Sequence, residues 1–358
     1  MSDSPIDRWL RPSGDPAAEP RWGHSEGLQI GIPPIPGPRG LLRVFTPYLE
    51  HPRERLVNFI AVEPIPQGAT ARGFSELETS ALDPGAQGKR FWSADDSAGA
   101  EGAVSVEHAA SAEGAASTEN AASTEGAAST ENAASTEGAA STENAVSTEN
   151  ASSPAPARGR IDTVDGIETL TVWIGVERFD NGADVRVRVR FFADRPHEVG
   201  VAGFANAASV PLSHLILTAT MGNWARLRQL HLADRIVTPA ELWPEFSGTA
   251  FTGHGRFPLA DLTREGDAAV VSATGDEEQP WSVEYSADTA DHWRFLGRRA
   301  VQTWRVDDPH PALEAVVNAR WSYWASASPI PGGPAYGNFE IIEPFRQGAA
   351  FRFSVEPL

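Results

Sequence analysis

A hexad repeat in the middle of the chain constrains the fold more than any other feature of the sequence. From Ala109 to Asn150, seven six-residue units follow one another: AASAEG, then AASTEN and AASTEG in alternation, and finally AVSTEN. A period of six matches neither the helical repeat of about 3.6 residues nor the strand repeat of about two, and large apolar side chains are absent. We therefore expect a long disordered insertion, with the folded domain built from the two flanking segments.

The insertion also accounts for most of the acidity of the chain. The formal net charge is −19 over 358 residues, and residues 95–157 contain 11 acidic and no basic side chains. The remaining 37 acidic and 29 basic side chains give a charge of only −8. A general nucleic-acid binder needs a basic surface to displace counterions from phosphates. The charge balance therefore predicts no nucleic-acid partner.

Several further classes are excluded by composition. The chain has no cysteine, which rules out disulfides, thiolate–zinc sites and a cysteine nucleophile. Residues 1–20 lack the basic and apolar regions of a signal peptide, and no apolar run approaches the roughly 18 residues of a membrane span. These features predict a cytoplasmic protein with no membrane partner.

Short apolar or alternating runs bounded by Gly, Pro, Asn and Asp flank the insertion and are typical of β-strands. In Val185–Phe191 a strict period of two places four apolar side chains on one side and three arginines on the other. Asn181-Gly182 favours a hairpin turn that joins this strand to Leu170–Phe179. The other expected strands are Leu28–Ile32, Leu41–Pro47, Leu56–Ile65, Phe74–Leu82, Arg90–Ser93, Val199–Ala205, Leu212–Thr220, Arg226–Leu232, Ala268–Ala273, Trp281–Tyr285, Ala300–Val306, Leu313–Ala325, Phe339–Ile342 and Phe351–Val355.

These signals predict an all-β fold, a large antiparallel β-sandwich of jelly-roll or supersandwich type. One short helix is expected over Thr238–Trp243, where a threonine N-cap precedes a proline at the first helical position. The expected organisation is a flexible N-terminus (1–20), the first part of the sandwich (21–94), the disordered acidic insertion (95–160) and the remainder of the same sandwich (161–358).

Four motifs together resemble an uncharacterised family of bacterial β-sandwich proteins found in bacteria rich in polysaccharide-degrading genes. They are LLRVFTPY (41–48) with VNFIAVEP (57–64), DRPHEV (194–199), LTATMGNWARLR (217–228) and PIPGGPAYGNFE (329–340). This resemblance covers most of the ordered chain and implies no established activity. Residues 338–355 also resemble the last hairpin of galactose-mutarotase-like domains, which would imply a sugar epimerase.

The tryptophan content favours carbohydrate as the ligand. There are 11 tryptophans, and several stand beside charged or amide residues, as in Asn223-Trp224-Ala225-Arg226 and Arg320-Trp321-Ser322-Tyr323-Trp324. Sugar rings have apolar faces and polar rims, which suit flat aromatic rings edged by such groups. The alternative is that these indoles fill the core of a large sandwich.

Cleavage of a glycosidic bond usually takes two carboxylates that face each other across the scissile oxygen. The candidate glutamates are Glu63, Glu76, Glu78, Glu177, Glu198 and Glu340. We take Glu63, Glu78 and Glu340 as the leading catalytic candidates. Glu63 ends an apolar strand, and Glu76 and Glu78 are two residues apart on one side of a strand, where the alternative is a pair of solvated side chains.

The segment Met221–Arg228 is the strongest candidate for substrate binding, because it places an amide, an indole and two guanidinium groups directly after an apolar strand. An internal salt-bridge network is the competing interpretation. A lyase would instead need basic or phenolic groups, for which Arg195 and His231 are further candidates. The predicted substrate-binding residues are Asn223, Trp224, Arg226, Arg228, His197, Trp324 and Tyr336.

The sequence contains no nucleotide-binding, zinc-protease or serine-hydrolase motif, and no pair of histidines at strand spacing. We expect a carbohydrate-active enzyme, either a glycoside hydrolase or a polysaccharide lyase, acting in a tryptophan-lined groove. A non-catalytic glycan-binding or structural sandwich and a mutarotase-like epimerase are the alternatives. No cofactor or metal is expected, although bound Ca²⁺ and a homo-oligomer stay open.

Overall fold

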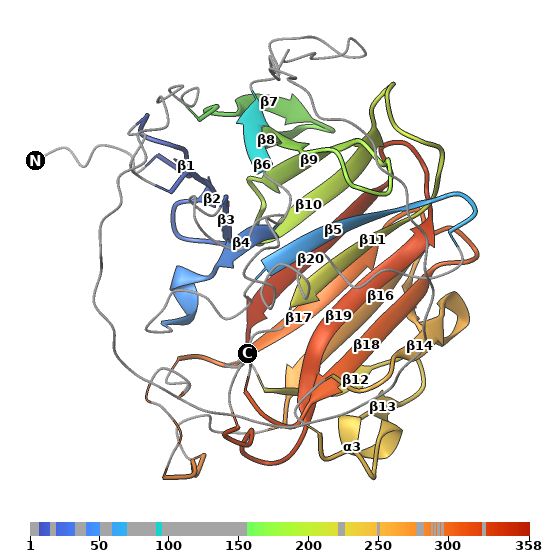
Figure 1. Ribbon diagram of the computed structural model, residues 1–358. Helices are drawn as coiled ribbons and strands as arrows, with labels where there is room; N and C mark the ends of the chain where they lie inside the picture. Colours follow the sequence, from blue (N-terminus) through green and yellow to red (C-terminus); the bar gives the residue numbers. More distant parts are fainter. Residues whose placement is uncertain are drawn as a thin grey trace, which may run out of the picture. The chain divides into compact units, whose positions relative to one another are not determined.

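The computed structural model describes residues 7–14, 19–32, 41–50, 59–69, 91–94, 156–220, 226–248, 251–276, 283–287, 289, 291, 294, 297–323 and 327–358. These residues all belong to one compact unit. Within it, two antiparallel sheets pack together, which confirms the predicted all-β sandwich (Figure 1). The hexad repeat lies outside the described residues.

Sheet A contains nine strands in the described part of the chain, in the order β1-β2-β3-β4-β5-β11-β19-β18-β14. Their bounds are β1 (Trp9–Leu10), β2 (Arg21–His24), β3 (Gln29–Gly31), β4 (Leu41–Phe45), β5 (Phe59–Pro66), β11 (Leu212–Thr220), β19 (Ala335–Pro344), β18 (Glu314–Arg320) and β14 (Gly255–Pro258).

Sheet B has the order β13-β12-β16-β17-β20-β10-β9-β8-β6, with β15 added to β16 and β7 added to β8. Its strands are β13 (Ile236–Val237), β12 (Leu227–His231), β16 (Ala268–Gly275), β17 (Ala300–Val306), β20 (Ala350–Pro357), β10 (Arg195–Ala205), β9 (Val185–Phe192), β8 (Ile167–Val176), β6 (Phe91–Ala94), β15 (Thr263–Glu265) and β7 (Arg160–Val164).

The hairpin of β8 and β9 is confirmed. Alternate side chains of β9 from Val185 to Phe191 are fully buried, while the arginines between them point outward. In the turn, Gly182 has a φ of 87°, and the side chain of Asn181 accepts a hydrogen bond of 2.9 Å from the Ala183 amide. The Asn-Gly pair therefore provides the positive φ that a tight turn requires.

Two buried tryptophans stabilise the sandwich. The indole of Trp304 in β17 donates a hydrogen bond of 3.0 Å to the Phe339 carbonyl in β19, which links sheet B to sheet A. The indole of Trp22 in β2 donates to the carbonyl of Ala157 at 2.9 Å. Because both indoles bury their rings and satisfy their N–H groups, these tryptophans are structural.

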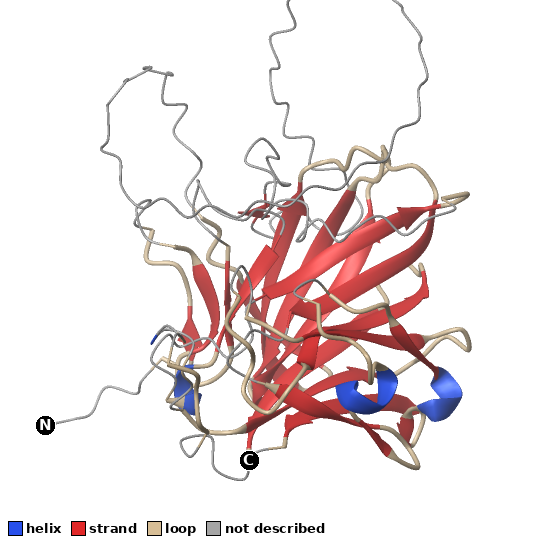
Figure 2. Cartoon of the chain, turned by 60° about the horizontal axis from the view of Figure 1, so that its bottom comes forward, coloured by secondary structure: helices blue, strands red, loops and turns tan. Residues whose placement is uncertain are grey.

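Helical structure in the described chain is confined to three short turns, η1 (Pro47–Leu49), α3 (Pro239–Leu242) and η2 (Leu259–Asp261), at the periphery of the strands (Figure 2). The predicted helix is confirmed as α3. Thr238 caps it through a reciprocal pair of hydrogen bonds with Glu241. No helix in the described residues is long and apolar enough to cross a membrane.

Three expectations are corrected by the structure. Residues 1–20 are not wholly flexible, since β1 pairs with β2 and the indole of Trp9 donates to Glu168 at 2.9 Å. Residues 283–285 are not part of a strand, because Tyr285 packs instead in a small cluster with Tyr323 and Ile330. The strand predicted over 313–325 ends at Arg320.

Residues 338–355 do not form a hairpin. β19 pairs with β11 and β18 in sheet A, whereas β20 pairs with β10 and β17 in sheet B. The connection between them therefore crosses from one layer of the sandwich to the other. The predicted strand Phe74–Leu82 lies outside the described residues.

Candidate functional site

Polar side chains lie on the outward side of the central strands of sheet A. Strand β11 pairs with β5 on one side and β19 on the other, and β18 follows β19. The registers place Glu63 opposite Ile216 and Glu340 opposite Thr218, so these side chains share one side of the sheet. We define the polar face by the residues Glu63, Thr218, Thr220, Asn318, Arg320, Asn338 and Glu340.

Two of the predicted catalytic glutamates belong to the polar face, and both are buried. Glu63 is 7% exposed and Glu340 is 2% exposed. The hydroxyl of Thr218 donates a hydrogen bond of 3.2 Å to Oε1 of Glu340. Glutamate is rarely buried so deeply without a specific role or partner. Two buried glutamates on either side of β11 therefore make this face the leading candidate site.

Hydrogen-bonding side chains extend the polar face towards the end of β18. The hydroxyl of Thr220 donates to Oδ1 of Asn338 at 3.3 Å. Oδ1 of Asn318 accepts a hydrogen bond of 3.1 Å from the backbone N–H of Asn338. Both asparagines are buried. A carboxamide offers both donors and acceptors, so it can bind groups that do the same, such as sugar hydroxyls.

Arg320 adds a cation to this end of the polar face. Its guanidinium lies over the ring of Phe251, 5.2 Å from the centroid. Gly337 makes room for that ring, because a Cβ at this position would press against it. The polar face therefore presents carboxylates, amides and a guanidinium stacked on an aromatic ring, all on one side of a single sheet.

The predicted residues Arg226 and Arg228 lie in a second cluster, where β12 begins. Arg226 donates a hydrogen bond to the hydroxyl of Tyr285. Arg228 forms an ion pair of 2.8 Å with Asp276 and donates to two backbone carbonyls of the loop before β19. Burial raises the pKa of Tyr323 to about 12, although the nearby Arg226 acts to lower it. These contacts tie β12 to the loop between β18 and β19.

His197 lies in sheet B and is not brought together with the glutamates of the polar face. Its Nδ1 is 2.7 Å from Oε2 of Glu356, and its ring stacks on Tyr48 with a centroid separation of 4.1 Å. The Tyr48 hydroxyl donates to the Val355 carbonyl at 2.7 Å. Burial raises the pKa of Tyr48 well above its usual value.

Tyr336 points into the core from β19. Its hydroxyl donates a hydrogen bond of 2.8 Å to the carbonyl of Val237, and burial raises its pKa above the usual range. Its side chain is therefore on the opposite side of β19 from Glu340. Four predicted site residues lie outside the described residues: Glu78, Asn223, Trp224 and Trp324.

Five tryptophans of the described ranges lie away from the polar face. Trp9, Trp22 and Trp304 are buried in the core. Trp92 in β6 and Trp173 in β8 lie on the outward side of sheet B. Two phenylalanines do lie at the polar face: Phe251 under the Arg320 guanidinium, and Phe59 opposite Thr220 in β5.

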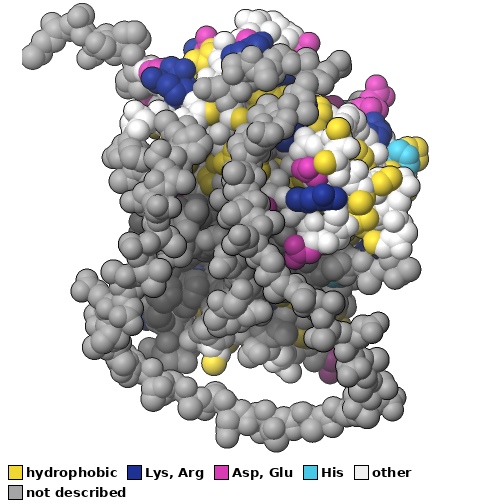
Figure 3. Space-filling model, turned by 45° about the horizontal axis from the view of Figure 1, so that its top comes forward, with side chains coloured by type: hydrophobic (Ala, Val, Ile, Leu, Met, Phe, Trp, Pro, Cys, Tyr) yellow, Lys and Arg dark blue, Asp and Glu magenta, His cyan; other side chains and the backbone are white. Residues whose placement is uncertain are grey.

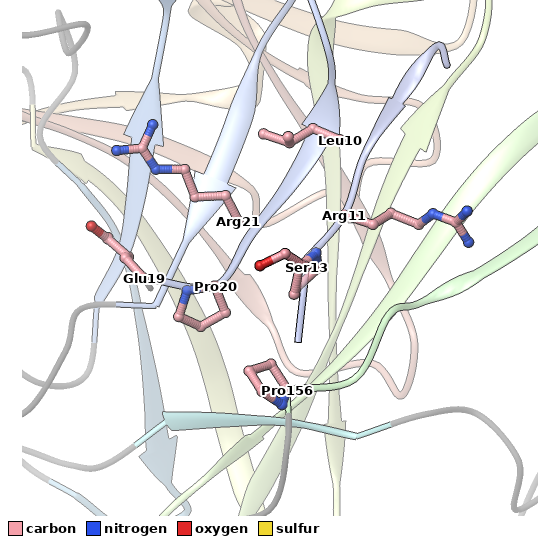
Figure 4. Close-up of a pocket in the computed structure, with 8 residues that line it drawn as sticks. Leu10, Arg11, Ser13, Glu19, Pro20, Arg21 and Pro156 are labelled. Carbon is pink, nitrogen blue, oxygen red and sulfur yellow. The ribbon is translucent and has the colours of Figure 1, made fainter. Parts of the chain in front are cut away.

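A pocket of about 250 Å³ lies beside β1 and β2, at the edge of sheet A (Figure 4). Its lining includes Glu19 and Arg21. Glu19 forms an ion pair of 3.1 Å with Arg43, and the guanidinium of Arg21 lies 3.7 Å from the centroid of the Phe45 ring. The pocket contains none of the residues predicted from the sequence.

Apart from Glu63 and Glu340, the polar-face residues are not among the candidates that the sequence predicts. Thr218 and Thr220 alternate with apolar residues in β11, and Asn338 and Glu340 do the same in β19. Polar residues spaced by two in otherwise apolar strands share one side of a sheet. This signal was present, but it becomes specific only once β11 and β19 are known to be neighbours.

No group of three or more potential metal ligands gathers within the described parts of the chain. Comparisons with protein-family models, curated proteins and solved structures give no significant match. The functional argument therefore depends on the geometry of the polar face.

Proposed function

We propose that the protein cleaves a glycosidic bond at the polar face, with Glu63 and Glu340 as the pair of carboxyl groups. The observation that carries this proposal is the placement of two buried glutamates on one side of sheet A, with β11 between them. Glycoside hydrolases use such a pair on opposite sides of the scissile bond.

The separation of the two glutamates favours an inverting reaction. They are two strands and two residues apart, which corresponds to about 12 Å between their Cα atoms at ordinary strand spacing. Side chains that lean towards each other would bring the carboxyl groups within the roughly 6.5–9.5 Å used by inverting enzymes. The shorter distance of about 5 Å in retaining enzymes would require both side chains to converge fully.

An inverting reaction needs one glutamate as the base and the other as the acid. We take Glu340, whose Oε1 accepts a hydrogen bond of 3.2 Å from Thr218, as the base that takes a proton from water. Glu63 is then the acid that protonates the departing glycosidic oxygen. Water adds to the anomeric carbon as the C–O bond breaks, and the two glutamates exchange protonation states.

The other polar-face residues supply substrate contacts. Asn318 and Asn338 can hydrogen-bond hydroxyl groups, and Arg320 can donate to a ring substituent. The ring of Phe251 lies against the Arg320 guanidinium and holds it in place. This combination of polar and flat apolar groups is typical of carbohydrate sites.

A panel of neutral and acidic polysaccharides tests the proposal, with release of reducing ends as the measurement. We expect the wild-type protein to cleave at least one of them, and E63Q and E340Q each to lose that activity. E314Q is the matched control, since Glu314 is on β18 in the same sheet, half-buried and paired with Arg256 at 2.6 Å. Unchanged cleavage by E63Q and E340Q would exclude the assigned pair. Binding of a glycan without any cleavage would favour a non-catalytic binding protein.

A further inference from the structure

The outward side of sheet B carries a cluster of arginines and aromatic rings on β6, β8, β9 and β10. The registers place Trp173 opposite Arg188, and Arg186 between Gly175 and Phe204. We define the arginine face by the residues Trp92, Trp173, Arg186, Arg188, Arg190 and Phe204. The space-filling view shows basic and hydrophobic side chains close together in the described surface (Figure 3).

The guanidinium groups of this face stack on its rings. Arg186 lies 4.8 Å from the centroid of the Trp173 ring, and Arg188 lies 5.2 Å from that of Phe204. The two rings contact each other, with centroids 5.0 Å apart. Stacking holds a guanidinium in place and leaves the N–H groups at its edge able to bind a carboxylate.

Two arginines of the face have no carboxylate partner among the described residues. Neither Arg186 nor Arg190 forms an ion pair or a side-chain hydrogen bond with any of them. Further along the same side of sheet B, Arg352 pairs with Glu198 at 3.2 Å and Arg305 pairs with Asp307 at 2.9 Å. Positive charge is therefore neutralised at that end and available at Arg186 and Arg190, in a folded part whose net charge is negative.

An exposed indole continues the arginine face. Trp92 is 36% exposed, and its ring lies on Gly175, where any Cβ would overlap it. Gly175 is opposite Arg186 in the adjacent strand. A flat indole next to a guanidinium can bind the C–H face of a sugar and its charged substituent together.

We infer that the arginine face is a binding surface for a linear acidic polysaccharide, separate from the polar face and independent of the function proposed for it. Arg186 and Arg190 are four residues apart, which places them about 13 Å from each other along β9 and suits a polymer with regularly spaced carboxylates. A single-stranded nucleic acid fits less well. It stacks bases on free aromatic rings, and here guanidiniums lie against Trp173 and Phe204.

Titration of the full-length protein with polygalacturonate at low salt tests this inference. We expect saturable binding that weakens with added salt, because charge contacts at a surface are screened. The R186Q/R190Q variant should raise the Kd by about tenfold or more, since each guanidinium contributes charge-assisted hydrogen bonds. The R186K/R190K variant keeps the charge but not the planar donors, so its Kd should lie between those of wild type and R186Q/R190Q.

R256Q provides the matched control, because it removes one positive charge from an exposed arginine of sheet A. Its Kd should stay within about threefold of wild type. The melting temperatures of all variants establish that they are folded. Three results would overturn the inference. They are no binding of polygalacturonate by wild type, equal Kd values for R186Q/R190Q and wild type, and a lower Kd of wild type for oligothymidylate than for polygalacturonate. E340Q should bind as wild type does, so loss of cleavage and loss of this binding are distinguishable.

Discussion

Thr218 donates a hydrogen bond of 3.2 Å to Glu340 from the adjacent strand, on a side of the sheet where both residues are buried. Removing one partner of a buried hydrogen bond costs about 1–3 kcal/mol. We therefore expect T218V to lower the free energy of unfolding by about 1–3 kcal/mol at neutral pH, while T218S, which keeps the hydroxyl, loses less. Urea unfolding measures both, and equal stabilities of T218V and wild type would contradict the role given to this contact.

The core contains one glutamine whose replacement should stabilise the protein. Gln302 in β17 is fully buried, and neither polar atom of its side chain has a hydrogen-bond partner among the described residues. Burying an amide without partners costs about 1–3 kcal/mol. Q302M, which has a similar shape and no amide, should therefore raise the free energy of unfolding by about 1–2 kcal/mol. A lower stability of Q302M would show that the amide is satisfied by a buried water.

The buried phenol of Tyr323 should make stability fall at high pH. Burial raises its pKa to about 12 from a usual value of 10.0, so the folded state favours the neutral form. Its contribution to stability is complete below pH 10 and is lost as pH rises through about 12. The difference in unfolding free energy between wild type and Y323F should therefore decrease over this interval. In a titration at 295 nm, a phenolate signal near pH 10 that disappears in Y323F would contradict the assignment.

Gly27 lies where the turn between β2 and β3 meets β10. A Cβ at this position would overlap the carbonyl oxygen of Pro196, which accepts a hydrogen bond of 2.8 Å from Leu28. Because the obstacle is backbone, G27A should destabilise the protein by about 1–3 kcal/mol. G253A is the control, since nothing lies within 4 Å of a Cβ there. Thermal unfolding should separate the two variants, and a neutral G27A would mean that this junction between the sheets can shift.

The sequence identifies strands well where local pattern and tertiary burial agree. Val185–Phe191 alternates strictly, and the structure buries the predicted side. The local sequence pattern fails where a contact with a residue distant in the chain determines the structure. Trp9 forms part of β1 because Glu168 and β2 provide partners, and Tyr285 leaves the strand pattern because Arg226 and Tyr323 hold it. Such contacts join residues far apart in the chain, so local periodicity does not contain them.

The candidate site was only partly predictable for the same reason. Glu63 and Glu340 were selected separately, and the order β5-β11-β19 places them on one face. Residue type alone groups the arginines of Met221–Arg228 with these glutamates, yet the structure puts Arg226 and Arg228 in the cluster at the start of β12. Residue type indicates what chemistry is available, whereas strand order determines which groups meet.

The most direct test of the account is the single-turnover cleavage rate of a bound oligosaccharide by E340Q, compared with wild type and E314Q. Loss of a general base should reduce the rate constant by about 10²–10⁴-fold, while the Kd for the oligosaccharide changes little. E314Q should cleave at the wild-type rate. An undiminished rate constant in E340Q would contradict the claim that the polar face of sheet A is the catalytic site.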